Sequence, residues 1–295
     1  MTRTNDSNEL GAFLRASRAR ITPKHAGLTL YGDRRRVPGL RREELAMLAG
    51  LSSSYYTRLE QGQSSGASTQ VLDSLAAALR LNDAERAHLH TLASHRDGTI
   101  RARVVRGSEI VDPGMVELLD AMWETPAMVL GRRSEVLAWN RPGHALLASH
   151  VSFDAPQYAT SRPVLAAMVF LDPAMRALFT DWPAKCRAVV GDLRLAVGHF
   201  PDDPALASLI GMLSMRSPEF AKLWADNRVQ ARATVQYEMQ HPSVGRLTLT
   251  KHALQSAGNP GQILVTHTAP TGSASREALA LLQHVAPSRT VASTL

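Results

Sequence analysis

The residues best suited to chemistry lie in the stretch Arg41–Gly62, where three polar side chains stand at helical spacing. Ser54, Arg58 and Gln61 occupy positions i, i+4 and i+7, so one face of a helix presents all three. An arginine guanidinium can donate two parallel hydrogen bonds to guanine O6 and N7, and a serine hydroxyl can bond a phosphate. The spacing therefore favours a helix that reads base-pair edges in a DNA major groove.

The neighbouring residues predict a helix, a turn and a second helix that would position this face. Leu45 and Leu48 fall on one side of the first helix. Gly50 suits the left-handed conformation that ends a helix, and the hydroxyl of Ser52 can cap the helix that follows. A short turn of this kind between two helices is typical of DNA-binding proteins.

The positive charge of the chain is confined to its N-terminal part. Residues 1–106 contain 17 Lys and Arg against 10 Asp and Glu, whereas residues 107–295 contain 16 of each kind. Because all of the net charge of +7 belongs to the first part, we expect that part alone to have a polyanionic partner.

Composition also bounds the class of protein. The 295 residues, 44% of them hydrophobic, are enough for two domains with cores of ordinary size. The single cysteine, Cys186, fits a reducing compartment and a core thiol. We find no signal-like segment and no apolar run long enough to span a bilayer, so we expect a cytoplasmic protein that does not bind membranes.

No motif in the chain has the spacing of a catalytic or metal site. The histidines are scattered and have no cysteine partners, and no glycine-rich phosphate loop follows a strand. We therefore expect no catalytic residues, no metal and no resident cofactor, and a protein that is not an enzyme. The rival reading, a second half that acts on an acyl substrate, lacks a polar constellation in its favour.

Three N-terminal segments together resemble the Cro-type or XRE-type helix-turn-helix domain. They are LGAFLRASRAR (10–20), the stretch 41–62 and VLDSLAAALRL (71–81). The resemblance implies an all-α, λ-repressor-like domain over residues 1–94. The first three of its five helices are expected at residues 9–19, 42–49 and 53–61. The fourth is expected to begin after a cap at Ser68 and to end at residue 79, and the fifth to begin after a cap at Asp83 and to end at about residue 93.

The resemblance also implies roles for individual residues. The expected DNA-binding residues on the two helices are Arg42, Ser53, Ser54, Tyr55 and Arg58, with Tyr55 exposed. Tyr56 replaces an aliphatic core residue, and Arg15 and Glu60 resemble an ion pair that joins the first helix to the third. Arg34, Arg35 and Arg36, in the loop before the second helix, are expected either to contact phosphates or the minor groove, or to be a solvated charge cluster.

The second half changes character after a linker at residues 95–111. Two short apolar runs, 127–132 and 135–140, predict a hairpin, and helical patterns follow up to residue 226. Alternation with a period of two then predicts strands around 235–240, 247–250 and 263–268 before a closing helix at 275–285. This order is that of an α+β PAS-like domain, here residues 112–295, with an apolar space between sheet and helices.

Several segments of the chain resemble the regulators that carry an MmyB-like ligand-binding domain. They are GDRRRVPGLRREELA (32–46), PAMVLGRRSEVLAWN (126–140), FLDPAMRALFTDW (170–182) and HPSVG (241–245). The resemblance implies a small apolar or amphipathic ligand, such as a fatty acid. In this chain Pro163 follows Arg162 where the family often has asparagine, and Asn227 stands where it often has histidine.

Candidate ligand-binding residues in the second half are the aromatic and methionine side chains of these segments and two basic ones. They are Arg162, Met168, Phe170, Phe179, Phe220, Trp224, Tyr237, Met239 and His241. Ordinary core packing is the alternative role of each apolar one.

The sequence thus predicts a regulator that binds a double-stranded DNA operator as a homodimer and senses a small amphipathic ligand. The alternative keeps DNA binding but makes the second domain a ligand-free module for dimerisation or protein contact.

Overall fold

The computed structural model describes residues 9–28, 38–63, 67–94, 109–226, 234–255, 259 and 261–285. Contacts divide the chain into two compact units. The first comprises Met1–Val104, Val190–Asp203 and Ala221–Ala231, and the second comprises Val105–Val189, Pro204–Phe220 and Arg232–Leu295. The linker expected at 95–111 falls mostly outside the described residues.

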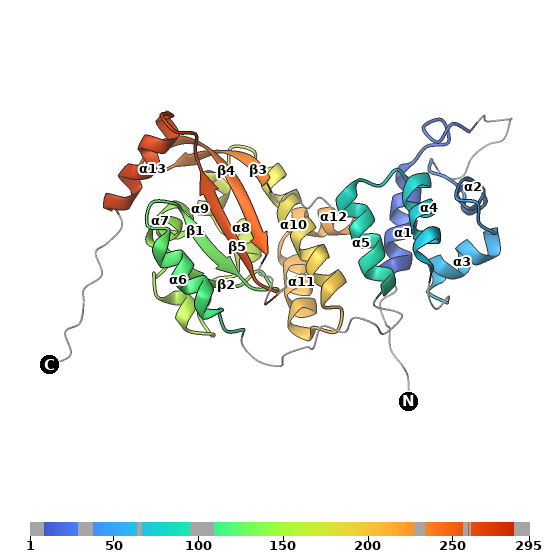
Figure 1. The fold of residues 1–295 in the computed structure, drawn as a ribbon, viewed down its shortest axis with the longest axis horizontal. Coiled ribbons are helices and arrows are strands. Elements are labelled where there is room, and N and C mark those ends of the chain that lie inside the picture. The colour runs from blue at the N-terminus through green and yellow to red at the C-terminus, as the bar shows by residue number, and fades with distance from the viewer. Residues whose placement is uncertain are drawn as a thin grey trace. The chain divides into compact units, whose positions relative to one another are not determined.

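Five helices form the N-terminal part of the first unit (Figure 1). They are α1 (Glu9–Arg20), α2 (Arg42–Leu48), α3 (Ser53–Gln61), α4 (Thr69–Ala78) and α5 (Asp83–Ser94). Their apolar faces meet in one core, in which Leu14, Leu45 and Leu75 are fully buried. The helices pack together because no single helix could bury its own apolar stripe. The expected all-α helix-turn-helix fold is confirmed.

The turn between α2 and α3 has the geometry that its residues predict. Gly50 adopts a left-handed conformation with φ of 67°. The Ser52 hydroxyl accepts a hydrogen bond of 3.2 Å from the backbone N–H of Tyr55 and so caps α3.

The cap of α5 differs from the prediction. The side chain of Asn82, not of Asp83, accepts from the backbone N–H of Glu85 at 2.9 Å, and the Glu85 carboxylate accepts from the backbone N–H of Asn82 at 3.1 Å. This reciprocal pair is a capping box, and it places Asp83 inside the first turn.

The remaining elements follow the predicted order of two strands, several helices and three strands (Figure 1). They are α6 (Pro113–Ala121), β1 (Ala127–Leu130), β2 (Val136–Trp139), α7 (Arg141–Ala148), η2 (Ala155–Gln157), α8 (Leu165–Leu171), α9 (Pro173–Leu178), α10 (Trp182–His199), α11 (Pro204–Arg216), α12 (Pro218–Ala225), β3 (Thr234–His241), β4 (Gly245–Gln255), β5 (Ile263–Thr268) and α13 (Ala274–Val285).

The five strands form one antiparallel sheet in the order β2-β1-β5-β4-β3. Strand β5, the last in the chain, lies in the centre of the sheet, where it pairs with β1 on one side and with β4 on the other. A mixed domain of an antiparallel sheet and packed helices is the α+β PAS-like architecture that the sequence predicts.

The register divides the sheet into two buried faces. We call the inner face the one formed by Met128, Val265, His267, Lys251, Leu249, Leu247, Tyr237, Met239 and His241. It is covered by α7, whose Ala145 carbonyl contacts His241 at 3.1 Å, and by the segment from α9 to α10, where Phe179 pairs with Met239. The opposite face packs on Leu119 of α6 through Ala127, Val129 and Leu264.

Two helices of the second half end before the point that the local sequence pattern predicts. The pattern predicts a helix from Asp112 to about Glu124 with Trp123 on its apolar side, but α6 ends at Ala121 and Trp123 is 67% exposed. It also predicts a helix over residues 173–182, but α9 ends at Leu178, because Phe179 becomes extended and pairs with Met239 at the edge strand β3. Within the described ranges no helix is both long and apolar enough to cross a membrane.

Candidate nucleic-acid interface and ligand-binding region

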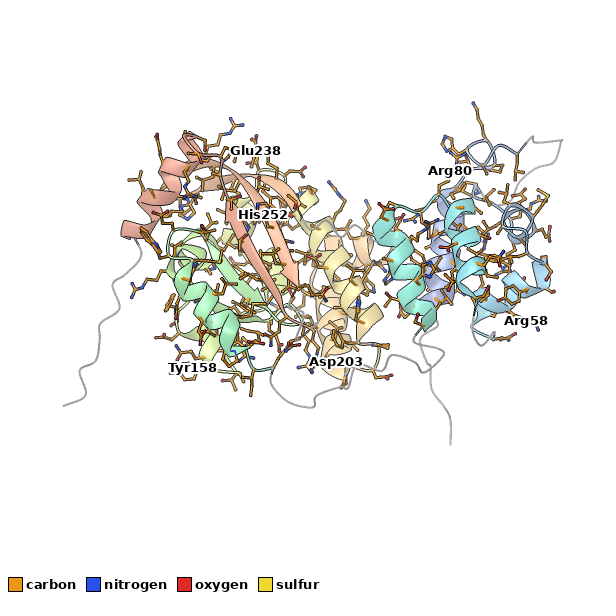
Figure 2. All side chains as sticks on the ribbon, viewed as in Figure 1. Arg58, Arg80, Tyr158, Asp203, Glu238 and His252 are labelled. Atoms are coloured by element: carbon orange, nitrogen blue, oxygen red, sulfur yellow. The ribbon has the colours of Figure 1, made fainter. Side chains whose placement is uncertain are left out.

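Helix α3 presents the predicted polar face to solvent. Ser53, Ser54, Arg58 and Gln61 are exposed, whereas Tyr56 and Leu59 on the opposite side are buried. Figure 2 shows Arg58 on the outer side of α3, away from the other helices. An exposed guanidinium flanked by short hydroxyl side chains can enter a groove and meet base edges without a steric obstacle.

Glu60 ties this helix to its neighbours on the buried side. Its carboxylate is fully buried and accepts from Arg18 Nε, Arg42 Nε and the Tyr56 hydroxyl, each at 2.7 Å. Burial alone would raise the pKa of the Glu60 carboxyl, but the hydrogen bonds from Arg18, Tyr56 and Arg42 hold it below its usual value. An ionised carboxylate at neutral pH therefore fixes α3 against α1 and α2.

Glu60 forms its ion pairs with other arginines than the expected Arg15. Arg18 and Arg42 form the ion pairs with the carboxylate, while Arg15 donates to the backbone carbonyl of Glu60 at 2.9 Å. Arg15 and Arg18 are three residues apart on α1 and face α3 together, so spacing alone does not separate them. The scaffold role predicted for Glu60 agrees with this geometry.

Arg42 is both part of this network and accessible. Its Nε–H is held by Glu60, yet 45% of the side chain remains exposed at the start of α2. A guanidinium fixed at one edge loses less rotamer entropy when its remaining donors bind a phosphate.

Two other predictions about this surface have different outcomes. Tyr55 is half-buried and packs against the helical core, so the expectation that it would be exposed is wrong. Arg34, Arg35 and Arg36 lie outside the described residues, and their contact with DNA stays a prediction.

The second unit contains a groove between α6, β2 and η2. Its volume is about 680 Å³, within the range of small-molecule sites. Val116, Trp139 and Phe153 give it an apolar lining, and the strongly exposed side chains Ile110 and Trp123 stand at its border.

Arg162, a predicted ligand anchor, lines this groove. Its Nε donates to the Pro156 carbonyl at 3.0 Å and its Nη1 donates to the Glu109 carbonyl at 2.9 Å. These bonds join the η2 segment to the start of the second unit, so Arg162 has a structural task beside any contact with a ligand.

The other predicted ligand residues do not gather at the groove. Phe170 and Phe220 stack edge to face at a centroid distance of 5.0 Å, and Met168 lies on the same helix as Phe170. Trp224 belongs to the first unit, where the Arg194 guanidinium lies 4.4 Å from its ring centre.

Four of the predicted residues do share one place, the inner face of the sheet and its cover. Phe179 and Tyr237 meet at a ring distance of 5.4 Å, and Met239 and His241 follow along β3. His241 is engaged at both ring nitrogens, because Nδ1 accepts from the Ser243 N–H and Nε2 contacts the Ala145 carbonyl.

Three basic residues of the inner region were not predicted. Lys185, Lys251 and His267 have exposed fractions of only 4%, 6% and 2%. Lys185 Nζ lies 5.1 Å from the ring centre of Tyr237, and Lys251 is the direct cross-strand partner of His267. A signal was present in the sequence, since Lys251 continues the inward alternation of Leu247 and Leu249.

Cys186, next to Lys185, is buried, and burial raises the pKa of its thiol to about 12. The thiol is therefore protonated and unreactive at neutral pH, as expected of a core residue. Across the part of the chain that the structure describes, no group of three or more His, Cys, Asp or Glu side chains could hold a metal ion.

Family models match both parts of the chain. Residues 111–282, more than half of the chain, match the MmyB-like transcription regulator ligand binding domain, and residues 9–89 match a helix-turn-helix domain. No curated protein matches the chain. The two family matches confirm both resemblances that the sequence motifs indicate.

Proposed function

Because the chain belongs to the MmyB-like transcription regulators, we propose that it binds a DNA operator as a homodimer and responds to a small amphipathic, fatty-acid-like ligand. The exposed polar face of α3 carries the DNA-binding part of this proposal. Arg58 is its base reader, Ser53 and Ser54 contact bases or phosphates, and Arg42 binds a phosphate beside them.

A dimer is needed because one helix in one groove reads too few base pairs for useful specificity. A ligand that favours one arrangement of the two subunits changes the spacing of the two α3 helices. Operator affinity then changes through a shift of populations, with no new contact to DNA. The apolar inner region and the groove at Arg162 support a ligand that has both an apolar and a polar part.

The experiment that tests this function is a native mass spectrum of the purified full-length protein, together with mass spectrometry of small molecules released by denaturation. A dimer that carries a stoichiometric amphipathic molecule is the expected result. Adding that molecule should change the affinity of the protein for operator DNA, measured by fluorescence anisotropy. A protein that binds DNA equally with and without it would contradict the sensing role.

A specific observation favours the alternative in which the second domain contacts protein. Ile110, Leu118 and Trp123 are 82%, 44% and 67% exposed, and large apolar side chains on a surface often mark an interface. A ligand-free homodimer in the native spectrum that becomes monomeric in Trp123→Ser would support this alternative.

A further inference from the structure

We infer that the groove between α6, β2 and η2 binds an aromatic monocarboxylate, with the carboxylate on Arg162 and the ring against Trp123 and Trp139. This inference goes beyond the proposed function, because the groove would hold a second ligand beside the fatty-acid-like one. The groove lies at β2, whereas the predicted ligand residues of the inner face gather at β3. These are the two edge strands of the sheet, and β1, β5 and β4 lie between them.

Two aromatic rings of the groove are fixed by their neighbours. Trp139 donates from Nε1 to the Phe153 carbonyl at 2.8 Å, and its side chain is only 6% exposed. The ring of His144 contacts both side chains, at centre distances of 4.9 Å to Trp139 and 5.3 Å to Phe153. Because these contacts hold the two rings, they offer flat surfaces that need no rearrangement to receive a flat guest.

Trp123 adds a third ring from the turn after α6. Its side chain lines the groove and is largely exposed, although its backbone is held in place. Asn140 Nδ2 donates to the carbonyl of Met122 at 2.7 Å and to that of Thr125 at 2.8 Å. A tryptophan on a fixed turn loses little conformational freedom when it stacks on a ligand, so Trp123 favours an aromatic guest.

Arg162 supplies the positive charge that faces the guest. Its hydrogen bonds to the carbonyls of Pro156 and Glu109 fix the guanidinium plane at the groove. The Glu109 carboxylate accepts instead from the backbone N–H of Arg132 at 3.2 Å. Since Arg162 forms no ion pair with a residue that the structure describes, a carboxylate can bind its remaining N–H groups without displacing another acid.

The charge of the lining matches a single carboxylate. Of the described residues that line the groove, the charged ones are Arg141, Arg162 and Asp120, so two positive charges stand against one negative charge. A monocarboxylate balances this excess of one, whereas a doubly charged phosphate would be repelled by Asp120. Apolar side chains such as Val116 and Leu137 complete the lining and favour a guest whose remaining surface is apolar.

The test measures the affinity of the full-length protein for two matched probes by calorimetry. 2-Naphthoate carries the ring and the carboxylate, and 2-naphthamide has nearly the same shape without the charge. We expect the acid to bind about tenfold more tightly than the amide, because its hydrogen bonds to Arg162 are charge-assisted. Decanoate, added as a competitor, should leave the affinity for 2-naphthoate unchanged, since a fatty acid is expected to bind elsewhere.

Arg162→Gln should abolish the preference for the acid while the amide still binds. Arg216→Gln, which removes an exposed arginine of α11 outside the groove, is the matched control and should keep the preference. Thermal unfolding of each variant verifies its fold.

Two further variants leave the hydrogen bonds of Arg162 in place and keep the test valid if Arg162→Gln does not fold. Asp120→Asn should tighten the binding of 2-naphthoate about threefold and leave that of 2-naphthamide unchanged, because only the acid is repelled by the aspartate. Trp123→Leu should weaken the binding of both naphthyl probes about fivefold, because a stacked ring is replaced by an alkyl group.

The outcomes distinguish this inference from the proposed function. Equal binding of acid and amide, or a preference that persists in Arg162→Gln, would overturn the carboxylate site. Decanoate that raises the apparent Kd of 2-naphthoate in proportion to its own concentration would overturn the second ligand and place the fatty-acid-like one in the groove. No binding of either naphthyl probe would overturn the inference, while the native mass spectrum would still decide whether the protein carries an amphipathic ligand.

Discussion

At the scale of single residues, Arg58 is the side chain that we propose reads the operator sequence. We expect Arg58→Ala to weaken binding to operator DNA by about 1–3 kcal/mol, because a bidentate contact to a guanine would be lost. Binding to random-sequence DNA should change much less. Fluorescence anisotropy with both duplexes measures the two effects, and Lys24→Ala, an exposed basic residue outside α3, is the control. Equal losses on both duplexes would assign Arg58 to the phosphates instead.

Glu60 should make the first unit sensitive to acid. Because hydrogen bonds lower the pKa of Glu60 in the folded state despite its burial, its stabilising effect is complete above the unfolded value of about 4.3. The effect is lost as the pH falls through the lower folded-state pKa. Urea unfolding at pH 7 should show Glu60→Gln to be less stable by about 3 kcal/mol, since Arg18 loses its buried counter-charge.

The difference between the two proteins should shrink when the same unfolding experiment is repeated at pH 3. A constant difference at both pH values would mean that the Glu60 carboxylate does not stabilise the fold through its charge. Tyr56→Phe provides a reference, because it removes one hydrogen bond to Glu60 and keeps both ion pairs.

Residue-level prediction from the sequence succeeds where the pattern is local and fails where partners are distant. Tyr56 and Glu60 are interpreted correctly as scaffold because they share one helix with the exposed face. The choice between Arg15 and Arg18 depends on how α1 is rotated against α3, which spacing within α1 does not determine. The basic cluster was missed because Lys185 and His267 meet only after the sheet and its cover have formed.

At the scale of elements, the turn between α2 and α3 depends on the left-handed backbone conformation of Gly50. Gly50 has φ of 67° and open space where a Cβ would stand, so Gly50→Ala costs only the strain of the left-handed conformation. We expect a loss of about 1 kcal/mol in the free energy of unfolding.

Gly211→Ala is the matched control for that variant. It also places a Cβ in open space, but it lies in the exposed interior of α11 without a positive φ. The alanine should stabilise the protein by roughly 0.5–1 kcal/mol. Opposite signs in urea unfolding are predicted; a loss of similar size at both positions would show that the Gly50 effect does not come from its backbone conformation.

Most elements follow from the sequence because their signals are short-range. The helix 53–61 and the strand 263–268 begin and end as the cap and the alternation predict. The errors arise at ends that tertiary contacts decide. Phe179 is extended and pairs with Met239 instead of continuing the helix. Asn82 and Asp83 are both good N-cap residues, and the local sequence does not determine which of them caps α5.

At the scale of the whole molecule, the two families account for a division of labour that the charge distribution already indicates. The excess of positive charge lies in residues 1–106, which include the match to a helix-turn-helix domain. The remainder of the chain, in which the charges balance, includes the match to the ligand-binding domain. Because phosphate contacts release counterions, operator affinity should fall steeply with salt.

Selection of DNA from a random-sequence duplex library by the full-length protein tests the central claim most directly. The account predicts enrichment of one motif with two half-sites, their centres about 10 base pairs or a multiple of that apart, as two copies of α3 require. Arg58→Ala should lose preference at one base of each half-site while Lys24→Ala selects the same motif. A library left unenriched by the unmodified protein, or an unchanged motif in Arg58→Ala, would contradict sequence reading by α3.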